Sequence, residues 1–300
     1  MATAQSAPVV VATKRGSLGA QIIRKQGRLL LYVIASLVAV FFVAPYLWTV
    51  GSSLKTSLEV REFPPALFPA RPRFENYLDI WNVVPLGRFF WNSTQVTLLA
   101  MVGQLASATL VAYGFSRFRF PGRDVVFLLV ISTILLPREV VLIPTFLIFK
   151  ELGWLDSLRP LIIPSYFGGG AFTIFLLRQF FLTLPRELDE ASKLDGANSF
   201  QILIGILLPL ARPALATVAI FAFQGHWNDF LEPLIYISKP EAFTLAIGLR
   251  YFQTLPNESQ EPREQLLMAA ALVTTAPILI IFFMAQRYFV QGIVMSGIKG

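Results

Sequence analysis

The chain has 300 residues, of which 55% are hydrophobic and 14% are charged, whereas about 25% of the residues of a soluble domain are charged. It contains no cysteine and one histidine, which excludes disulfides, thiolate chemistry and a metal site built from several histidines. Basic residues beside anionic lipid account for the net charge of +7 without a nucleic-acid partner, so we expect an all-α polytopic membrane protein.

Six apolar segments predict six transmembrane helices, because a bilayer core of about 30 Å requires about 20 apolar residues in a helix. Four of these segments carry no charge, and two contain charged side chains. The expected spans are Leu29 to Val50, Phe89 to Ser116, Val125 to Phe149, Pro160 to Leu177 with a few flanking residues, Leu210 to Ile237, and Leu266 to Gln286. We assign them to a single transmembrane domain over residues 28–300.

The amino-terminal segment, residues 1–27, is small, polar and basic and shows no apolar period, so we expect a mobile cytoplasmic tail. The apolar run after it is too long for the hydrophobic part of a signal peptide. Lys and Arg are slightly more frequent in the segments that this orientation places inside, which favours a cytoplasmic location for both termini.

The third expected span contains Pro137 near its centre and Pro144 beyond it, so we expect it to be kinked or broken. Arg138 and Glu139 lie about 20 Å into this span if it is helical, close to the middle of the bilayer. Ionisable groups at that depth are candidates for a solute pathway. An adjacent, mutually neutralised pair that stabilises the proline break explains them equally well.

The segment between the fourth and fifth spans, "LPRELDEASKLDG", is densely charged. Its six ionisable side chains, each costing about 2.5 to 3.5 kcal/mol at the bilayer centre, prevent it from crossing the membrane. We expect a helix from Pro185 to Asp195, about 16 Å long, with acids near its positive amino-terminal end. One apolar stripe runs along this helix, formed by Leu184, Leu188, Ala191 and Leu194.

The residues after this helix predict a turn and a second helix. Gly196 suits the position just past the helix end, where we expect a left-handed backbone. Asn198 or Ser199 can cap a new helix with Gln201 in its third position, and Pro209 marks the bend into the fifth span. These features alone fit an interfacial helix that ties two spans together as well as they fit a docking site.

The spacing of these residues carries a resemblance. "EAS", three residues, Gly196, nine residues and "ILLP" resemble the pattern E-A-A, x3, G, x9, I-x-L-P of the membrane subunits of bacterial ABC importers, with Ser192 in place of a second alanine. "HWNDFLEPLIY", "FTLAIGL" and the closing segment from Met268 to Gly300 are similar to carbohydrate permeases of the maltose-transport type. The resemblance covers Phe89 to Gly300.

The resemblance implies that the charged helix is a cytoplasmic coupling helix that docks on an ATPase. Gly196, Pro209 and four residues of the helix would form the contact region, so the candidate coupling residues are Glu187, Glu190, Ala191, Ser192, Gly196 and Pro209. It also implies that the tail from Met295 to Gly300 approaches the ATPase pair. The chain has no G-x-x-x-x-G-K-[ST] phosphate loop, so we expect ATP and Mg²⁺ to be bound by partner subunits and no catalysis or cofactor in this chain.

The expected assembly, again implied by the resemblance, is an importer in a bacterial inner membrane. It would contain a second related permease, two ATPase subunits and an extracytoplasmic solute-binding protein, toward which the segment from Ser238 to Gln265 would reach. The solute would be a sugar or an oligosaccharide. The alternatives are an ABC permease for glycerol phosphate or a polyol, and a secondary transporter, for which ion-coupling residues and repeated halves are not evident.

Two further motifs concern the solute path. Trp227, Asn228 and Asp229 place an aromatic ring beside an amide and a carboxylate, which suits sugar recognition and also suits an aromatic belt at the membrane interface. The glycines from Gly168 to Gly170 favour close helix packing over phosphate binding.

Overall fold

The computed structural model describes residues 18–254 and 263–297, with side chains over residues 27–250 and 263–286, and these residues form helices joined by loops. The α-helices are α1 (Leu18–Ser53), α2 (Asn76–Val83), α3 (Leu86–Arg117), α4 (Arg123–Ser132), α5 (Arg138–Glu151), α6 (Arg159–Ile162), α7 (Ala171–Thr183), α8 (Glu187–Leu194), α9 (Ser199–Ile202), α10 (Leu208–Leu210), α11 (Arg212–Trp227), α12 (Leu231–Tyr236), α13 (Leu245–Thr254) and α14 (Glu264–Gly297). Short 3-10 turns are η1 (Glu59–Arg61), η2 (Thr133–Leu135), η3 (Ile163–Tyr166) and η5 (Pro240–Ala242), and η4 (Leu203–Leu207) is a π-helix.

Several of these helices are long and apolar enough to cross a membrane. Within the described residues, four segments qualify singly: Gly27–Ser53, Leu86–Arg117, Arg159–Thr183 and Glu264–Gln286. Two more qualify as bent pairs, Arg123–Leu135 with Arg138–Glu151 and Ser199–Leu210 with Arg212–Tyr236. The chain is therefore a polytopic membrane protein with four spans, or up to six if each bent pair is one span.

The boundaries differ from expectation at two of these segments. Helix α1 begins at Leu18, inside the expected tail, and residues 1–17 lie outside the described part of the chain. The fifth expected span was placed from Leu210, but Leu210 is where the second bent pair turns by 82°. Pro213 lies in the first turn of α11, where proline is tolerated, so the turn falls just before it.

The third expected span is broken at Pro137, as its prolines predicted. Leu136 and Pro137 have extended backbone, with ψ of 117° and 135°, and the two halves meet at 100°. Proline lacks an N–H group and disfavours helical backbone in the residue before it, which accounts for the break. Each half is about 20 Å long, so neither half alone crosses a bilayer core of about 30 Å.

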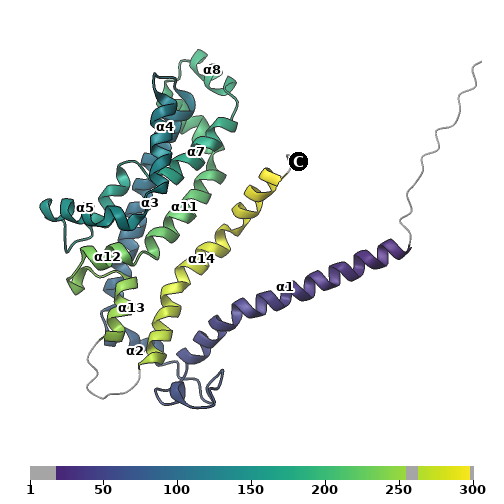
Figure 1. Ribbon diagram of the computed structural model, residues 1–300, viewed down its shortest axis with the longest axis vertical. Coiled ribbons are helices and arrows are strands. Elements are labelled where there is room, and N and C mark those ends of the chain that lie inside the picture. Colours follow the sequence, from purple (N-terminus) through teal and green to yellow (C-terminus); the bar gives the residue numbers. More distant parts are fainter. Residues whose placement is uncertain (1–17, 255–262, 298–300) are drawn as a thin grey trace, which may run out of the picture.

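Helix α3 is the central element of the bundle. It packs against α7, α11, α6, η3 and α13, with α13 near its start, η3 near its middle and α7 along its second half (Figure 1). Its first half contributes Phe89 and Val96 to one buried apolar cluster with α11, α12 and α13. Its second half contributes Ala108 and Tyr113 to another cluster with α7 and η4. One helix therefore connects α2 and α13, at one end of the molecule, with α8 at the other.

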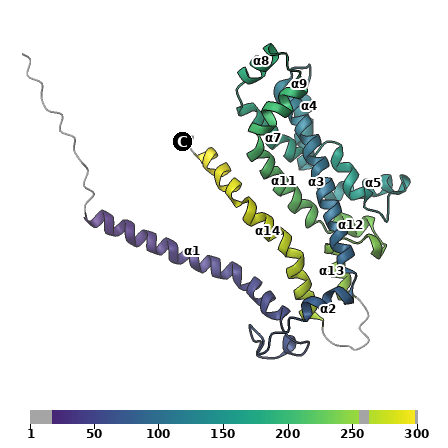
Figure 2. The same ribbon diagram turned by 180° about the vertical axis from the view of Figure 1, so that it is seen from behind.

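Helix α1 is the least enclosed part of the molecule. The carboxyl-terminal end of α1 contacts α14, whereas the earlier part of α1 points away from the bundle, as both views of the ribbon show (Figures 1 and 2). Its apolar side chains from Leu29 to Val43 are exposed in the isolated chain. Lipid or another membrane subunit must cover them.

Candidate functional site

Helix α8 lies beyond the neighbouring ends of α3 and α7, at one end of the bundle (Figure 1). It ends in a Schellman motif, in which the Ala197 N–H donates to the Ser192 carbonyl at 2.9 Å and the Gly196 N–H donates to the Lys193 carbonyl at 3.0 Å. Gly196 has a φ of +85°, which confirms the expected left-handed backbone. The predicted helix is thus present, although it is shorter than the expected range from Pro185 to Asp195.

Helix α9 follows through the expected capping box. The Asn198 side chain accepts hydrogen bonds from the N–H groups of Phe200 and Gln201 at 3.0 and 2.9 Å, and Gln201 Oε1 accepts from the Asn198 N–H at 2.8 Å. Asn198, and not Ser199, is therefore the cap. We call residues 187–202, which run through α8 and α9, the α8–α9 segment.

The inward face of α8 carries polar side chains, and the later part of its apolar stripe, Ala191 and Leu194, is exposed. Asp189 and Ser192 are each 8% exposed, whereas Leu194 is 90% exposed and Ala191 is also exposed. Asp189 forms an ion pair with Arg117 of α3, which explains why this face turns inward. The exposed face therefore combines small and apolar side chains with acidic ones.

The candidate coupling residues divide between these two faces. Glu187, Glu190 and Ala191 are exposed, and so are Gly196 and Pro209. Ser192 is buried, and its Oγ donates a hydrogen bond to the Leu188 carbonyl at 2.5 Å. Five of the six residues are thus accessible to another protein, and Ser192 is accessible only if α8 moves.

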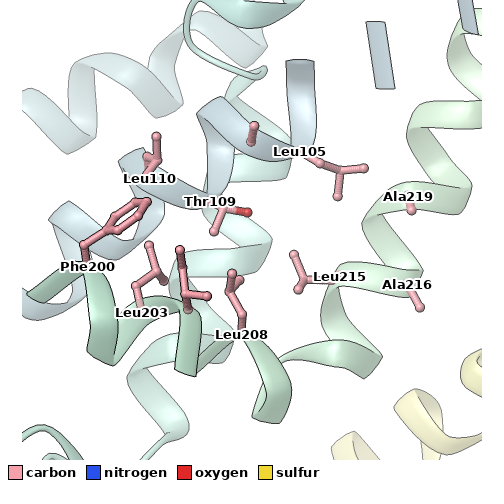
Figure 3. A pocket seen from close by; sticks show the side chains of 11 residues that line it. Leu105, Thr109, Leu110, Phe200, Leu203, Leu208, Leu215, Ala216 and Ala219 are labelled. Atoms are coloured by element: carbon pink, nitrogen blue, oxygen red, sulfur yellow. The ribbon is translucent and has the colours of Figure 1, made fainter. Parts of the chain in front are cut away.

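An apolar pocket of about 580 Å³ lies next to this segment, between α3, α9 to α10, and α11 (Figure 3). Thr109 supplies the one side-chain oxygen of the lining. Phe200 and Leu203 come from the α9 side and face Leu105 and Leu110 of α3 across it. The remaining lining residues are Ala106, Ile204, Leu208, Leu215, Ala216 and Ala219.

A polar cluster lies halfway along α3. Gln104 Nε2 donates to Thr173 Oγ1 of α7 at 2.9 Å, and Gln104 Oε1 lies 2.9 Å from His226 Nε2 of α11. Beside it, Gly169 has a φ of +61°, and a Cβ there would lie 2.6 Å from the Cβ of Ala108. The glycine run therefore packs closely on α3, as expected, and breaks the helix just before α7.

Arg138 forms an ion pair, but Glu139 is not its partner. Arg138 Nη2 donates to Glu232 Oε1 of α12 at 2.6 Å. Glu139 is exposed. The hypothesis of an adjacent neutralised pair is therefore wrong, because the proline break turns Arg138 toward α12. Arg138 remains 67% exposed, so it faces an open surface of the isolated chain.

Trp227 belongs to the packing of the bundle. It is 4% exposed, its ring stacks on Phe223 with centroids 5.4 Å apart, and its Nε1 donates to the Thr274 carbonyl at 3.0 Å. No ring face is left for a sugar or for the membrane interface, so both sequence hypotheses for this side chain are corrected. Asn228 is exposed and Asp229 is half-buried at the start of α12, and these two remain pathway candidates.

Sequence reasoning did not select four residues of these sites: Arg117, Gln104, His226 and Glu232. The signal for Glu232 was available, since an acid inside an apolar span is a candidate by the same argument that selected Arg138. Arg117 could not be selected, because a basic residue at the end of a span is ordinary. Its role depends on a contact with a distant part of the chain.

Comparisons with known proteins agree on one class. A family model described as "Binding-protein-dependent transport system inner membrane component" matches residues 104–295. The chain is 33% identical over 283 residues to the galactooligosaccharides transport system permease protein GanQ of Bacillus subtilis, covering 93% of this chain and 98% of that one. It is 32% identical to the diacetylchitobiose uptake system permease protein NgcG of Streptomyces coelicolor, covering 83% and 82% of the two chains.

Two further similarities involve other solutes. The sn-glycerol-3-phosphate transport system permease protein UgpE of Pectobacterium atrosepticum is 33% identical, over 88% of this chain and 94% of that one. Among solved structures, a chain of a bacterial ABC transporter involved in the import of the acidic polysaccharide alginate has a TM-score of 0.80 and 25% identity, covering 88% of this chain and 97% of that one.

Proposed function

The chain belongs to the family of binding-protein-dependent transport system inner membrane components, and we infer that it is the membrane-spanning permease subunit of an ABC importer for sugars or oligosaccharides. In this role it forms half of the translocation pathway and passes solute without covalent chemistry. The observation that carries the coupling part of the proposal is the exposed face of α8, where Leu194 is 90% exposed beside acidic side chains. This face, with exposed Ala191 and Leu194 beside carboxylates at the end of the bundle, offers both apolar and charged groups to another protein.

The partner at that face is an ATPase subunit. Glu187 and Glu190 offer carboxylates to basic side chains, while Ala191 and Gly196 allow another surface to approach closely. Two such ATPase subunits would bind ATP and Mg²⁺, one under this permease and one under a second, related permease. The α8 end of the bundle is then cytoplasmic, as are both termini, and the opposite end meets the solute-binding protein.

The solute path runs along the open side of α5, α11 and α12. Arg138, Glu139, Asn228 and Asp229 are its candidate residues from this chain, and the structure adds Glu232 through its ion pair with Arg138. ATP-driven closure of the ATPases shifts the equilibrium between inward-facing and outward-facing states, because each state binds its partners differently.

Two solute classes are favoured by specific relatives. Permeases for galactooligosaccharides and diacetylchitobiose support a neutral oligosaccharide. The permease for sn-glycerol-3-phosphate, at a similar identity, supports a small phosphorylated polyol as the second candidate. We propose the oligosaccharide, since several of the matched relatives carry such names.

The test uses the complete importer in proteoliposomes, with the cognate second permease, ATPases and binding protein. We expect ATP-dependent uptake of a labelled galactooligosaccharide and no uptake by this chain alone. Leu194→Asp should weaken capture of the ATPase, because it places a further negative charge on the most exposed apolar side chain of the contact face. The matched control is Leu58→Asp, since Leu58 is 79% exposed near the opposite end of the molecule.

Each outcome has a clear meaning. Uptake by this chain without an ATPase would overturn the proposal and favour a secondary transporter. Uptake of glycerol 3-phosphate in preference to the oligosaccharide would transfer the proposal to the second solute class. Equal ATPase capture by both leucine variants would remove α8 as the contact.

A further inference from the structure

Arg117, the last residue of α3, joins three elements through one side chain. Its Nε lies 3.2 Å from Asp189 Oδ2 of α8, and its Nη1 and Nη2 each donate to the Leu184 carbonyl, just past α7, at 3.2 Å. The ion pair is buried, with the two side chains 6% and 12% exposed. Removing either charge would leave the other without its partner in a site with little water, so loss of one partner should weaken the attachment of α8 to α3.

Tyr113 makes a second attachment one helical turn earlier. Its hydroxyl donates to the Ser199 carbonyl, at the first residue of α9, at 3.0 Å. Its ring packs edge to face on Phe181 of α7, with centroids 6.5 Å apart. Residues four apart lie on one face of a helix, so Tyr113 and Arg117 fix the two arms of the α8–α9 segment to the same face of α3.

These two contacts are the polar side-chain links between the segment and the rest of the bundle. Within the described residues, no other ion pair or side-chain hydrogen bond joins α8 or α9 to a transmembrane helix. Ile202 adds apolar packing, which tolerates sliding better than a paired charge does. A displacement of α8 can therefore reach α3 through these two contacts, in addition to the covalent links from the segment to α7 and η4.

Helix α3 carries that displacement toward the middle of the membrane. Gln104 lies 13 residues before Arg117, about 20 Å along the helix, and contacts both Thr173 of α7 and His226 of α11. His226 precedes the pathway candidates Asn228 and Asp229 by only a few residues. The α8–α9 segment is thus joined to α3 by Arg117 and Tyr113, and α3 is joined to α11 by Gln104, close to the pathway candidates Asn228 and Asp229.

We propose that Arg117 and Tyr113 are positioning residues that couple the docked α8–α9 segment to α3, so that movement of the ATPases is converted into movement of the transmembrane helices. The inference rests on the proposed function. It assigns to the end of α3 a task distinct from docking, because docking uses the opposite, exposed face of α8. Loss of the pair should therefore separate ATP hydrolysis from transport and leave ATPase capture intact.

The test uses the reconstituted importer and the absence of native cysteine in this chain. Arg117→Cys with Asp189→Cys should still capture the ATPases but hydrolyse ATP with little stimulation by the binding protein and with at least a fivefold lower uptake per ATP. A short bis-methanethiosulfonate cross-linker between the two cysteines should restore uptake per ATP, and reductant should abolish it again. A purely structural role would not respond to a link added after assembly.

Milder variants cover the case in which the double variant does not assemble. Tyr113→Phe removes one hydroxyl and should lower uptake per ATP while leaving ATPase capture unchanged. Arg117→Lys keeps a positive charge beside Asp189 but has one side-chain nitrogen instead of three, so it should do the same. Its matched control is Arg123→Lys, because Arg123 lies near the same end of the bundle and pairs with the exposed Asp124. Wild-type uptake per ATP in the cysteine pair without cross-linker, or in both milder variants, would overturn the proposal. Failure of the wild-type chain to capture any ATPase would overturn the proposed function instead.

Discussion

Replacement of Gly196 by alanine isolates one energetic effect at the coupling segment. Gly196 has a φ of +85°, a region in which an L-residue is disfavoured by about 1 to 2 kcal/mol. A Cβ at this position would meet no atom within 4 Å, so no clash adds to that cost. The backbone hydrogen bonds of the Schellman motif do not involve a side chain, so the variant can still form them. The whole penalty therefore falls on the left-handed turn that sets the direction of α9.

This penalty predicts a measurable change in coupling. About 1 to 2 kcal/mol corresponds to a 5- to 30-fold smaller equilibrium constant for forming the docking-competent turn. We expect the rate of binding-protein-stimulated ATP hydrolysis by the reconstituted importer to decrease by up to that factor. Membrane insertion should be normal. The control is Gly205→Ala, because a Cβ at Gly205 also meets no atom within 4 Å and its φ is not positive. That variant should keep wild-type activity.

The comparison between the two alanine variants tests whether coupling requires the left-handed turn at Gly196. Equal stimulated hydrolysis in Gly196→Ala and Gly205→Ala would refute the reasoning, whether both are active or both are inactive. Loss of insertion in Gly196→Ala would show that the turn serves folding and not docking. A Gly196→Val variant should behave like Gly196→Ala with a larger loss, since valine is stiffer at χ1.

Three other substitutions follow from the contacts of α3 and α5. Gly169→Ala should lower the melting temperature of the purified importer more than Gly168→Ala does. A Cβ at Gly169 would lie 2.6 Å from the backbone N of Ala108, whereas a Cβ at Gly168 would meet no atom within 4 Å. Equal melting temperatures of the two variants would contradict this. Gln104→Leu should lower the free energy of unfolding in detergent by about 0.6 kcal/mol for each of the two hydrogen bonds that Gln104 forms. An unchanged free energy of unfolding would show that this polar cluster does not stabilise the fold. Glu232→Gln should reduce uptake more than Glu139→Gln, because Glu232 forms the ion pair with Arg138; the reverse order in a transport assay would argue against this pair in the solute path.

Local signals made the α8–α9 segment predictable. Charge density placed it outside the bilayer, and Gly196 and Asn198 end one helix and begin the next through contacts within a few residues. The orientation of α8 was not predictable in this way. The stripe of four apolar residues did not indicate which face is buried, and the contact between Asp189 and Arg117 places two polar residues, Asp189 and Ser192, on the inward side. Such a pairing depends on two helices meeting in space, and no pattern within either helix contains it.

The partners of Arg138 and the surroundings of Trp227 were unpredictable for the same reason, since both depend on helices that meet in space. Arg138 and Glu139 are neighbours in the chain, and a sequence pattern treats neighbours as partners. The 100° bend at Pro137 gives Arg138 a partner on α12 instead. The position of the break was predictable from proline chemistry, whereas its angle and direction depend on the packing of α5 against α12. Trp227 was similarly ambiguous, since a large aromatic side chain suits a core, an interface and a binding site equally well.

The break at Pro137 has a consequence for the abundance of this chain in a cell. Helix ends leave peptide groups without intrahelical partners, and lipid cannot satisfy them. In a copy without a partner subunit, lipid leaves these peptide groups at Pro137 without hydrogen bonds. A partner subunit that covers the break can supply them. Folding and assembly are then linked by mass action. We therefore expect copies without a partner to be less stable than assembled ones and to be degraded sooner by membrane proteases.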